Sequence, residues 1–182
     1  MTDVLLVAAT RDELCGNEGL ACGIGPVDAA AATARALAIH PPEAVVHVGV
    51  AGALRITPGA IVIGTEAVYC DLSAGVEVVH TDRPDAELLA VLRDAFPDAL
   101  ALPIGTSAAV GGPCSSDTFR LRVEAMEGFA VLRACAAALV PAIEVRAVSN
   151  SIGESDRGRW QIARALASLG DALPRLLAAV RN

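Results

Sequence analysis

The sequence contains no lysine: all 14 basic residues among its 182 are arginine, against 21 acidic residues, and the formal net charge is −7. The arginines form no basic patch, so the electrostatic footprint of a nucleic-acid-binding protein is missing. Aromatic residues make up only 3% of the chain, which leaves no row of rings to stack on exposed bases. We therefore expect no nucleic-acid partner.

Long apolar runs are also absent. No stretch approaches the roughly 18 uninterrupted apolar residues of a membrane span. The short apolar run at residues 4–9 follows an acid and precedes charges, so it indicates a buried strand and not a signal peptide. These features predict a cytoplasmic protein with no membrane partner. Hydrophobic residues nevertheless make up 54% of the chain, and the mean hydropathy is +0.52. Such surplus apolar surface predicts a homo-oligomer, a dimer or higher.

Metal and cofactor motifs are missing as well. The five cysteines are scattered without a C-x-x-C pair, and the three histidines have no ligand spacing to them. We expect reduced thiols and neither a metal nor an organic cofactor. The segment Gly23-Ile24-Gly25-Pro26 lacks the third glycine of a dinucleotide fingerprint, so it indicates a tight turn before a helix.

Valine- and isoleucine-rich runs alternate with alanine-rich segments of helical period. The runs predict strands at residues 4–9, 44–48, 60–69 and 142–149, with irregular strands at 102–107 and 110–112. The intervening segments predict helices at 26–39, 85–95, 121–138 and 159–180, the last interrupted at residues 170–171. This alternation is typical of an α/β fold around a mostly parallel sheet, and we expect one domain over residues 1–182.

In such folds ligands bind beyond the carboxyl ends of the strands. Glu13 follows the first expected strand, a glycine loop at 49–52 follows the second, and Ser149 and Asn150 follow the last. Glu127, an acid in an apolar helical pattern, must point into the same crevice to be tolerated. Two carboxylates near one crevice suit glycosidic chemistry. Glu13 taken alone is better explained as an ordinary surface acid, and the glycines suit tight packing as well as a ligand.

Six segments carry a family resemblance in order along the chain: AATRDEL, GIGPVDAAAATARAL, HVGVAGAL, PGAIVIGTEAVYCDL, EAMEGFA and EVRAVSNSIG. Together they resemble the purine nucleoside phosphorylase/methylthioadenosine nucleosidase superfamily. The ending SNSIGESDRGRW and the CDL at 70–72 look most like the futalosine hydrolase family. The resemblance implies a three-layer α/β fold with a mixed, mostly parallel central sheet flanked by helices. It also implies hydrolysis of the N-ribosidic bond of futalosine, in menaquinone biosynthesis, with release of hypoxanthine and no cofactor.

The resemblance also implies roles for the matched residues. Glu127, with Met126, would bind the ribose hydroxyls, and Glu13 would orient and deprotonate the attacking water. Ala51 and Gly52 would line the sugar and base pocket. The small nucleoside and water would be the partners. Asp12 beside Glu13 disfavours phosphate as the attacking group, since like charges repel.

Asn150 stands where the adenine nucleosidases of the superfamily carry an aspartate that protonates purine N7. An amide cannot deliver a proton, but it donates and accepts hydrogen bonds at N7 and a 6-oxo group. This departure favours a hypoxanthine leaving group, and Ser149 beside it would help to bind the substrate. Phe119 would stack on the base or serve as a core aromatic. An arginine, Arg157 or Arg159, could bind the aryl carboxylate of futalosine, or both could belong to a solvated helix start capped by Asp156.

Three alternatives stay open. A methylthioadenosine/S-adenosylhomocysteine-type nucleosidase and a purine nucleoside phosphorylase share most of these motifs. The segment 14–22 is too short for the extra hairpin that relatives usually carry, which also allows an inactive nucleoside-binding module.

Overall fold

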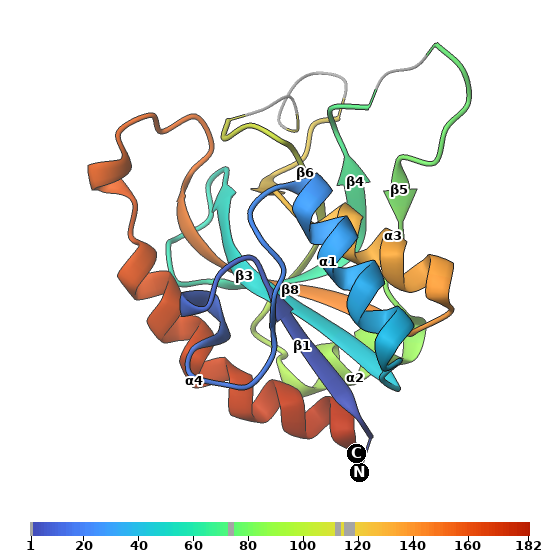
Figure 1. The fold of residues 1–182 in the computed structure, drawn as a ribbon. Coiled ribbons are helices and arrows are strands. Elements are labelled where there is room, and N and C mark those ends of the chain that lie inside the picture. Colours follow the sequence, from blue (N-terminus) through green and yellow to red (C-terminus); the bar gives the residue numbers. More distant parts are fainter. Residues whose placement is uncertain (1, 73–74, 112–113, 115–118) are drawn as a thin grey trace.

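The computed structural model describes residues 2–72, 75–111, 114 and 119–182. Strands from the whole length of the chain build one sheet, with helices packed on both of its faces (Figure 1). The strands are β1 (Val4–Ala8), β2 (Leu20–Ala21), β3 (Ala44–Ala53), β4 (Ile61–Tyr69), β5 (Thr81–Asp82), β6 (Leu100–Thr106), β7 (Val123–Ala125) and β8 (Ala142–Ser151). The helices are α1 (Pro26–Ile39), α2 (Ala86–Ala95), α3 (Gly128–Ala138) and α4 (Ile162–Arg181), with short 3-10 turns η1 (Asp12–Leu14) and η3 (Arg157–Arg159).

The sheet is mixed and mostly parallel, as expected. Its strand order is β2-β1-β3-β7-β6-β4-β5, and β8 pairs with both β3 and β4. Five of the eight strand pairings in the described residues are parallel. Because β3 also pairs with β7 and β4 with β6, the pairings β3-β8-β4-β6-β7 return to β3. The long strands β3 and β8 therefore form the centre of the molecule.

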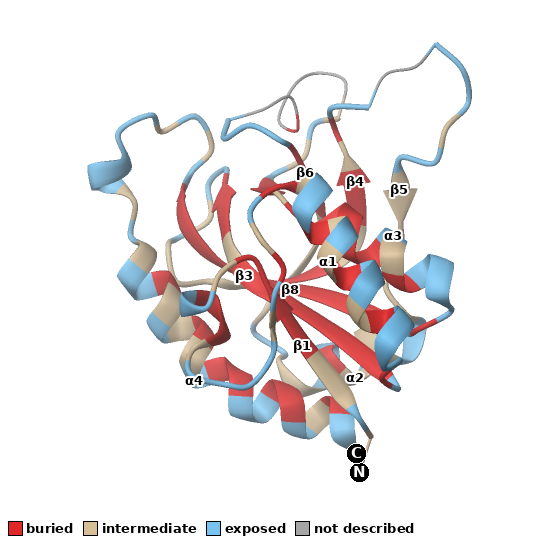
Figure 2. Cartoon of the chain, in the orientation of Figure 1, coloured by how far each residue is buried: buried red, intermediate tan, exposed pale blue. Residues whose placement is uncertain are grey.

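Both faces of the central strands are covered, which confirms the three-layer fold. Successive residues of a strand point to opposite faces, and in β3 Val45 joins the core beneath α1 and α3 while Val46 joins the core beneath α2 and α4. The two cores leave the central strands buried along almost their full length (Figure 2). This double burial explains why the strands are apolar throughout and do not alternate with polar residues.

The central strands β3 and β8 extend further than the sequence predicted. Residues 49–52, expected as a glycine loop, lie within β3, and Ser149 and Asn150 lie within β8. The two strands pair along their full length with one irregularity at Ala51/Gly52. Ladder hydrogen bonds use the backbone, so glycines and small polar residues take part as well as valine does.

The helix expected at 121–138 begins only at Gly128. Residues 123–125 form β7, which lies between β3 and β6, and Glu127 is the N-cap residue of α3. A three-residue strand is held by its two neighbours and has too few residues to show a period. Of the expected strand at 110–112, Val110 and Gly111 form a turn, and residue 112 lies outside the described residues.

The C-terminal helix was expected to break at residues 170–171, but α4 continues through them. Its side chains Leu169, Leu173 and Leu176 are completely or almost completely buried. Burial of each such side chain is worth about 1.5–3 kcal/mol, whereas a helical glycine costs only about 1 kcal/mol relative to alanine. Packing therefore outweighs the weak helix preference of Gly170.

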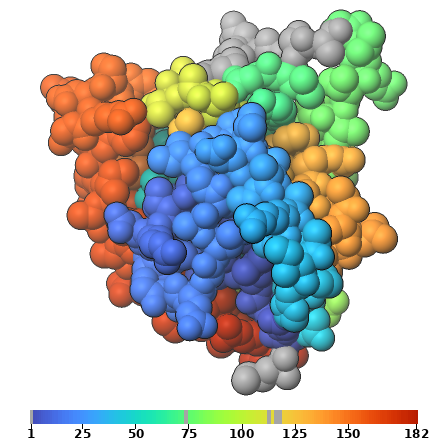
Figure 3. All heavy atoms as spheres, viewed as in Figure 1, coloured from blue at the N-terminus to red at the C-terminus, as the bar shows by residue number. Residues whose placement is uncertain are grey.

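The start of α1, residues near 70 and residues near 110 lie together on the surface at the carboxyl end of the parallel strands (Figure 3). Several of the large apolar side chains there are exposed, among them Ile24, Val27 and Val110. Between residues 14 and 22 the structure has only the two-residue strand β2, so the expected absence of an extra hairpin is confirmed. Among the described residues, no helix is both long and apolar enough to cross a membrane.

Candidate active site

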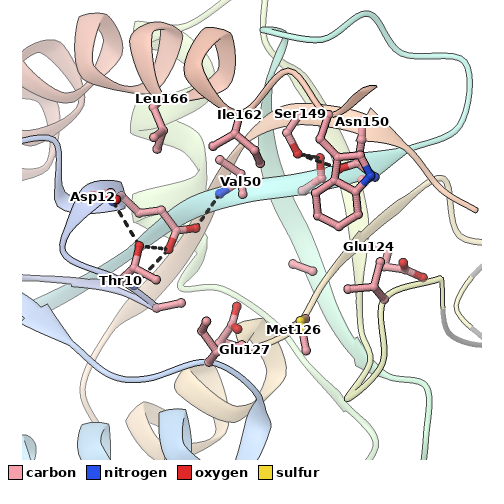
Figure 4. Close-up of a pocket in the computed structure, with 18 of the residues that line it drawn as sticks. Thr10, Asp12, Val50, Glu124, Met126, Glu127, Ser149, Asn150, Ile162 and Leu166 are labelled. Atoms are coloured by element: carbon pink, nitrogen blue, oxygen red, sulfur yellow. Dashed lines mark hydrogen bonds between the residues drawn. The ribbon is translucent and has the colours of Figure 1, made fainter. Parts of the chain in front are cut away.

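A cavity of about 320 Å³ opens at the carboxyl end of the parallel strands (Figure 4). Its walls come from the segment after β1, the ends of β3 and β8, the β7–α3 junction and the start of α4. The structure brings most of the predicted site residues together there. Those lining the cavity are Glu13, Ala51, Gly52, Met126, Glu127, Ser149, Asn150 and Arg157.

Two predicted site residues do not reach the cavity. Phe119 packs with Leu121 against a small core formed by Val68, Cys70 and Cys114, which is the alternative stated for it from the sequence. Arg159 forms ion pairs with two acids of its own segment, at 3.4 Å and 3.7 Å.

Glu13, in η1, is held by three hydrogen bonds, two from Thr10 in the segment after β1 and one from β3. One carboxylate oxygen, Oε2, accepts from the backbone N–H and the hydroxyl of Thr10, at 3.0 and 2.9 Å. The other, Oε1, accepts from the backbone N–H of Val50 at 3.0 Å. The side chain is buried yet lines the cavity. A carboxylate offers about four acceptor positions, so one remains for a ligand or water.

Glu127 is held from the opposite wall of the cavity. Its Oε1 accepts from the backbone N–H of Gly25 at 3.0 Å, in the predicted turn before α1. Gly25 has φ +93°, a conformation that favours glycine. The turn therefore supplies an amide to the site as well as starting the helix. Burial raises the pKa of Glu127, and the nearby charge of Arg146 opposes the rise.

Beneath these two carboxylates lies a buried polar cluster that the sequence reading missed, formed by His47, Glu144 and Arg146. Arg146 is fully buried; its Nε donates to Glu144 Oε1 at 2.8 Å, and its Nη2 lies 3.6 Å from Glu127 Oε2. Nη2 also makes a short contact with Nε2 of His47. The Nδ1 of His47 lies 3.1 Å from the carbonyl oxygen of Val7, so Nδ1 carries the ring proton and Nε2 accepts from the arginine. Burial and the Arg146 charge hold the pKa of His47 well below its usual value.

Two glycines make room for this cluster. A Cβ on Gly49, which pairs with Arg146 across β3 and β8, would collide with the Arg146 guanidinium and the Glu13 carboxylate. A Cβ on Gly128 would collide with the carboxylate of Glu144. The sequence did hold a signal for the cluster: Glu144 and Arg146 are two residues apart, so on a strand both point to one face.

Asn150 has a fixed amide orientation. The hydroxyl of Ser149 donates to Asn150 Oδ1 at 2.7 Å and also lies 3.2 Å from the carbonyl oxygen of Ala51. The amide nitrogen of Asn150 donates to the Ser151 carbonyl at 3.0 Å. One amide hydrogen and one oxygen lone pair are left over. They give the side chain one donor and one acceptor for a ligand.

Glu124 is a further cavity-lining acid, one that the sequence reading did not single out. Gly52 pairs with Glu124 on one side and with Asn150 on the other, so the two side chains flank a residue that has none. Glu124 Oε1 accepts from the backbone N–H of Gly111 at 2.7 Å, while the buried Oε2 has no partner among the described residues. Burial raises the pKa of Glu124. Had residues 122–126 (RVEAM) been predicted as a strand and not as part of a helix, Glu124 would have been placed on the cavity wall.

Within the described residues, no group of three or more histidine, cysteine, aspartate or glutamate side chains is placed to hold a metal ion. The polar groups of the cavity are carboxylates, an amide, hydroxyls and a guanidinium. These groups can accept and donate protons and hydrogen bonds to a nucleoside-sized polar ligand.

Comparison with known proteins places this cavity in context. The Phosphorylase superfamily model matches residues 19–182. The futalosine hydrolase of Streptomyces coelicolor is 35% identical over 185 residues, covering 88% of this chain and 78% of that protein. The futalosine hydrolase of Thermus thermophilus is also 35% identical, over 181 residues that cover 87% of this chain and 80% of that protein.

Solved structures share the fold. The 5′-methylthioadenosine/S-adenosylhomocysteine nucleosidase of Colwellia psychrerythraea, solved in complex with adenine, superimposes with a TM-score of 0.88 over 98% of this chain and 96% of that one. Its sequence identity is 19%, so this likeness concerns the fold.

Proposed function

The chain belongs to the phosphorylase superfamily and, within it, to the futalosine hydrolase family, and from that membership we propose that it hydrolyses the N-ribosidic bond of futalosine and releases hypoxanthine. The observation that carries the proposal is the meeting of Glu13, Glu127 and Asn150 around one cavity. The three come from different elements, η1, the start of α3 and β8. Both relatives named above bear the name futalosine hydrolase.

Glu13 suits the role of general base. Three of its acceptor positions are occupied by fixed donors, and its side chain lines the cavity, so one position is left for a water molecule there. In the proposed reaction a water oxygen bonds to C1′ of the ribose while the C1′–N9 bond breaks. The water proton passes to Glu13, the bonding electrons leave with the base, and the departing hypoxanthine anion takes up a proton from solvent water, after which Glu13 releases its proton to solvent. Proton transfer to a positioned carboxylate of this kind contributes typically about 10²–10⁴-fold in rate.

Glu127 suits the binding of the ribose hydroxyls and the stabilisation of the positive charge that develops on the sugar. An ionised carboxylate performs both tasks, and the Gly25 amide and the Arg146 guanidinium favour that ionised form against burial. Asn150 is placed to accept from or donate to the departing base. Its amide supports a 6-oxopurine leaving group and not adenine cleavage of the methylthioadenosine type.

Hydrolysis is favoured over phosphorolysis by the charge of the cavity. Four carboxylates line it, those of Asp12, Glu13, Glu124 and Glu127. A phosphate anion beside them would meet repulsion of the kind that an uncharged water molecule avoids. The joint presence of Glu13 and Glu127 on one cavity likewise counts against an inactive binding module.

We further propose that residues 1–182 act as one domain, in the cytoplasm, and as a homo-oligomer. The high apolar content and the exposed apolar side chains near the cavity mouth support the last point. A second copy of the chain packed there would also narrow the mouth, which the short segment 14–22 leaves without a hairpin.

A substrate assay tests the proposed function. Purified protein is offered futalosine, inosine and methylthioadenosine, each with and without phosphate, and the free base is measured. We expect hypoxanthine from futalosine at a rate that phosphate does not change. Cleavage of inosine only when phosphate is present, or methylthioadenosine as the best substrate, would replace the proposal with one of its rivals.

A further inference from the structure

The segment between β8 and α4 contributes two side chains to the cavity wall, Arg157 and Trp160. The Arg157 guanidinium lies 5.6 Å from the centre of the Trp160 ring. Trp160 is half-buried, and its indole N–H donates to the carbonyl oxygen of Glu154 at 3.0 Å. One hydrogen bond thus fixes an aromatic surface at the cavity, with a cation beside it.

Arg157 is the one cation among the described residues that line the cavity, against the four carboxylates named above. An anionic group on a ligand would be repelled by those acids over most of the wall. Only the part of the cavity beside Arg157 offers it an opposite charge.

The neighbouring arginine is already occupied. Arg159 is paired with Glu154 and Asp156, so its charge is balanced within its own segment. Arg157 forms no ion pair with any acid of the described residues and is exposed. Asp156 caps the short turn η3 through the backbone N–H of Gly158 at 2.9 Å, which holds the backbone that carries Arg157.

We infer that Arg157 and Trp160 form the subsite for the aryl carboxylate of the substrate, and that Arg157, not Arg159, selects nucleosides bearing this acidic aromatic group. The inference rests on the proposed function and names the residues of its specificity. A guanidinium pairs with a carboxylate through two parallel hydrogen bonds, and an indole face packs against an aryl ring. A neutral aliphatic substituent, such as a methylthio group, would gain nothing from Arg157.

The test compares futalosine with its methyl ester, in which one methyl group removes the carboxylate charge. Arg157→Ala should lower the ratio of kcat/KM for futalosine to kcat/KM for the ester by about 10- to 100-fold, as expected for loss of a charge-assisted pair. Most of the loss should appear in KM for futalosine. Arg157→Lys should recover part of it, because the charge remains while the paired geometry is lost. Trp160→Ala should lower kcat/KM for both substrates, because both carry the aryl ring.

Arg159→Ala is the matched control, with the same substitution two residues away, and it should leave the ratio within about twofold of the unmodified protein. If Arg157→Ala lowered kcat/KM equally for both substrates, or if Arg159→Ala lowered the ratio, the assignment would be overturned. Cleavage of futalosine by the unmodified protein would still stand. If the unmodified protein failed to cleave futalosine, the proposed function would fall, and the subsite with it.

Discussion

At the scale of single residues, the site depends on one buried arginine. Arg146 lies among Glu13, Glu127 and Glu144, and of the guanidinium groups in the described residues it is the one that balances these three carboxylates. Burial raises the pKa of both Glu127 and Glu144, with the Arg146 charge as the main opposing effect. Buried carboxylates are expensive when unpaired and tolerable when paired. The arginine thereby offsets part of the cost of burying these acids beside the cavity.

Glu127→Gln removes that charge with little change of shape. The amide oxygen still accepts from Gly25, so folding should persist, while the ability to stabilise positive charge on the sugar is lost. We expect kcat/KM to fall by about 100-fold or more, the scale of losing one electrostatic partner of a transition state. Steady-state kinetics with futalosine measure it, with the thermal midpoint as the control for folding. Near-normal turnover would remove Glu127 from the site.

Glu124→Gln concerns stability and pH. Burial, with a contribution from nearby Asp71, raises the pKa of Glu124 above its ordinary value of 4.5. The folded state therefore binds this proton more tightly than the unfolded state, so the free energy of unfolding falls as the pH rises above about 4.5 through the raised pKa. Glutamine removes this effect. Its melting temperature should equal that of the unmodified protein at low pH and exceed it increasingly toward pH 8.

Thermal unfolding between pH 4 and pH 8 measures the difference. Glu18→Gln is the control, since Glu18 is exposed and the same substitution there should give no such trend. A difference that stayed constant with pH, or that shrank as the pH rose, would show that the Glu124 carboxylate is not penalised by burial.

At the scale of elements, the sequence predicted the bounds of a helix best where residues of that helix alone determine its ends. The bounds predicted for α1, residues 26–39, are those observed, because glycine and proline fix the start and an apolar stripe fixes the face. The start of α2 was equally well marked, since Asp85 accepts from two backbone N–H groups of its first turn. In each case the signal lies within a few residues of the helix start that it marks.

The sequence did not predict an element that is stabilised only by pairing with neighbouring strands. The strand β7 has three residues and is held between β3 and β6, so nothing local distinguished it from the helix that follows. Likewise, Glu13 and Glu127 were predicted to share a crevice, but the arginine that balances them comes from the middle of β8. Its role depends on register with Gly49 across the sheet, and register does not follow from one strand's composition.

Gly49→Ala tests that dependence of the site on one strand position. Its Cβ would meet the Arg146 guanidinium and the Glu13 carboxylate, both of which are fixed by hydrogen bonds. We expect a loss of about 1–3 kcal/mol in the free energy of unfolding, the usual cost of overpacking, together with reduced activity. Urea denaturation measures the first, and the futalosine assay measures the second.

Gly170→Ala is the contrasting variant at the element scale. Gly170 lies in α4, and the nearest atom to an added Cβ is 3.6 Å away, on Cys15. The substitution should therefore stabilise the protein by about 0.5–1 kcal/mol, the gain of alanine over glycine in a helix. Equal effects of the two substitutions would mean that the close approach at Gly49 does not constrain the sheet.

At the scale of the whole molecule, the apolar lining of the cavity continues onto the exposed surface around its mouth. Ile24 and Val110 line the cavity and are also exposed, at 62% and 46%. Val27, in the first turn of α1 and three residues beyond Ile24, extends this apolar rim and is 78% exposed. A rim of this kind beside a cavity mouth is more costly in water than scattered single residues. It suits a second copy of the chain, which would bury the rim and restrict the mouth together.

The unmodified protein should therefore have a mass of at least twice 18.5 kDa in solution, measured by light scattering after size exclusion. Val27→Asp places a charge on the rim and should shift the protein toward 18.5 kDa, because an unpaired charge cannot enter a packed interface cheaply. Leu139→Asp is the control: Leu139 is 91% exposed but precedes β8, at the opposite end of the parallel strands. A monomer before any substitution would contradict the proposed oligomer. Dissociation by Leu139→Asp but not by Val27→Asp would place the interface at the opposite end of the parallel strands.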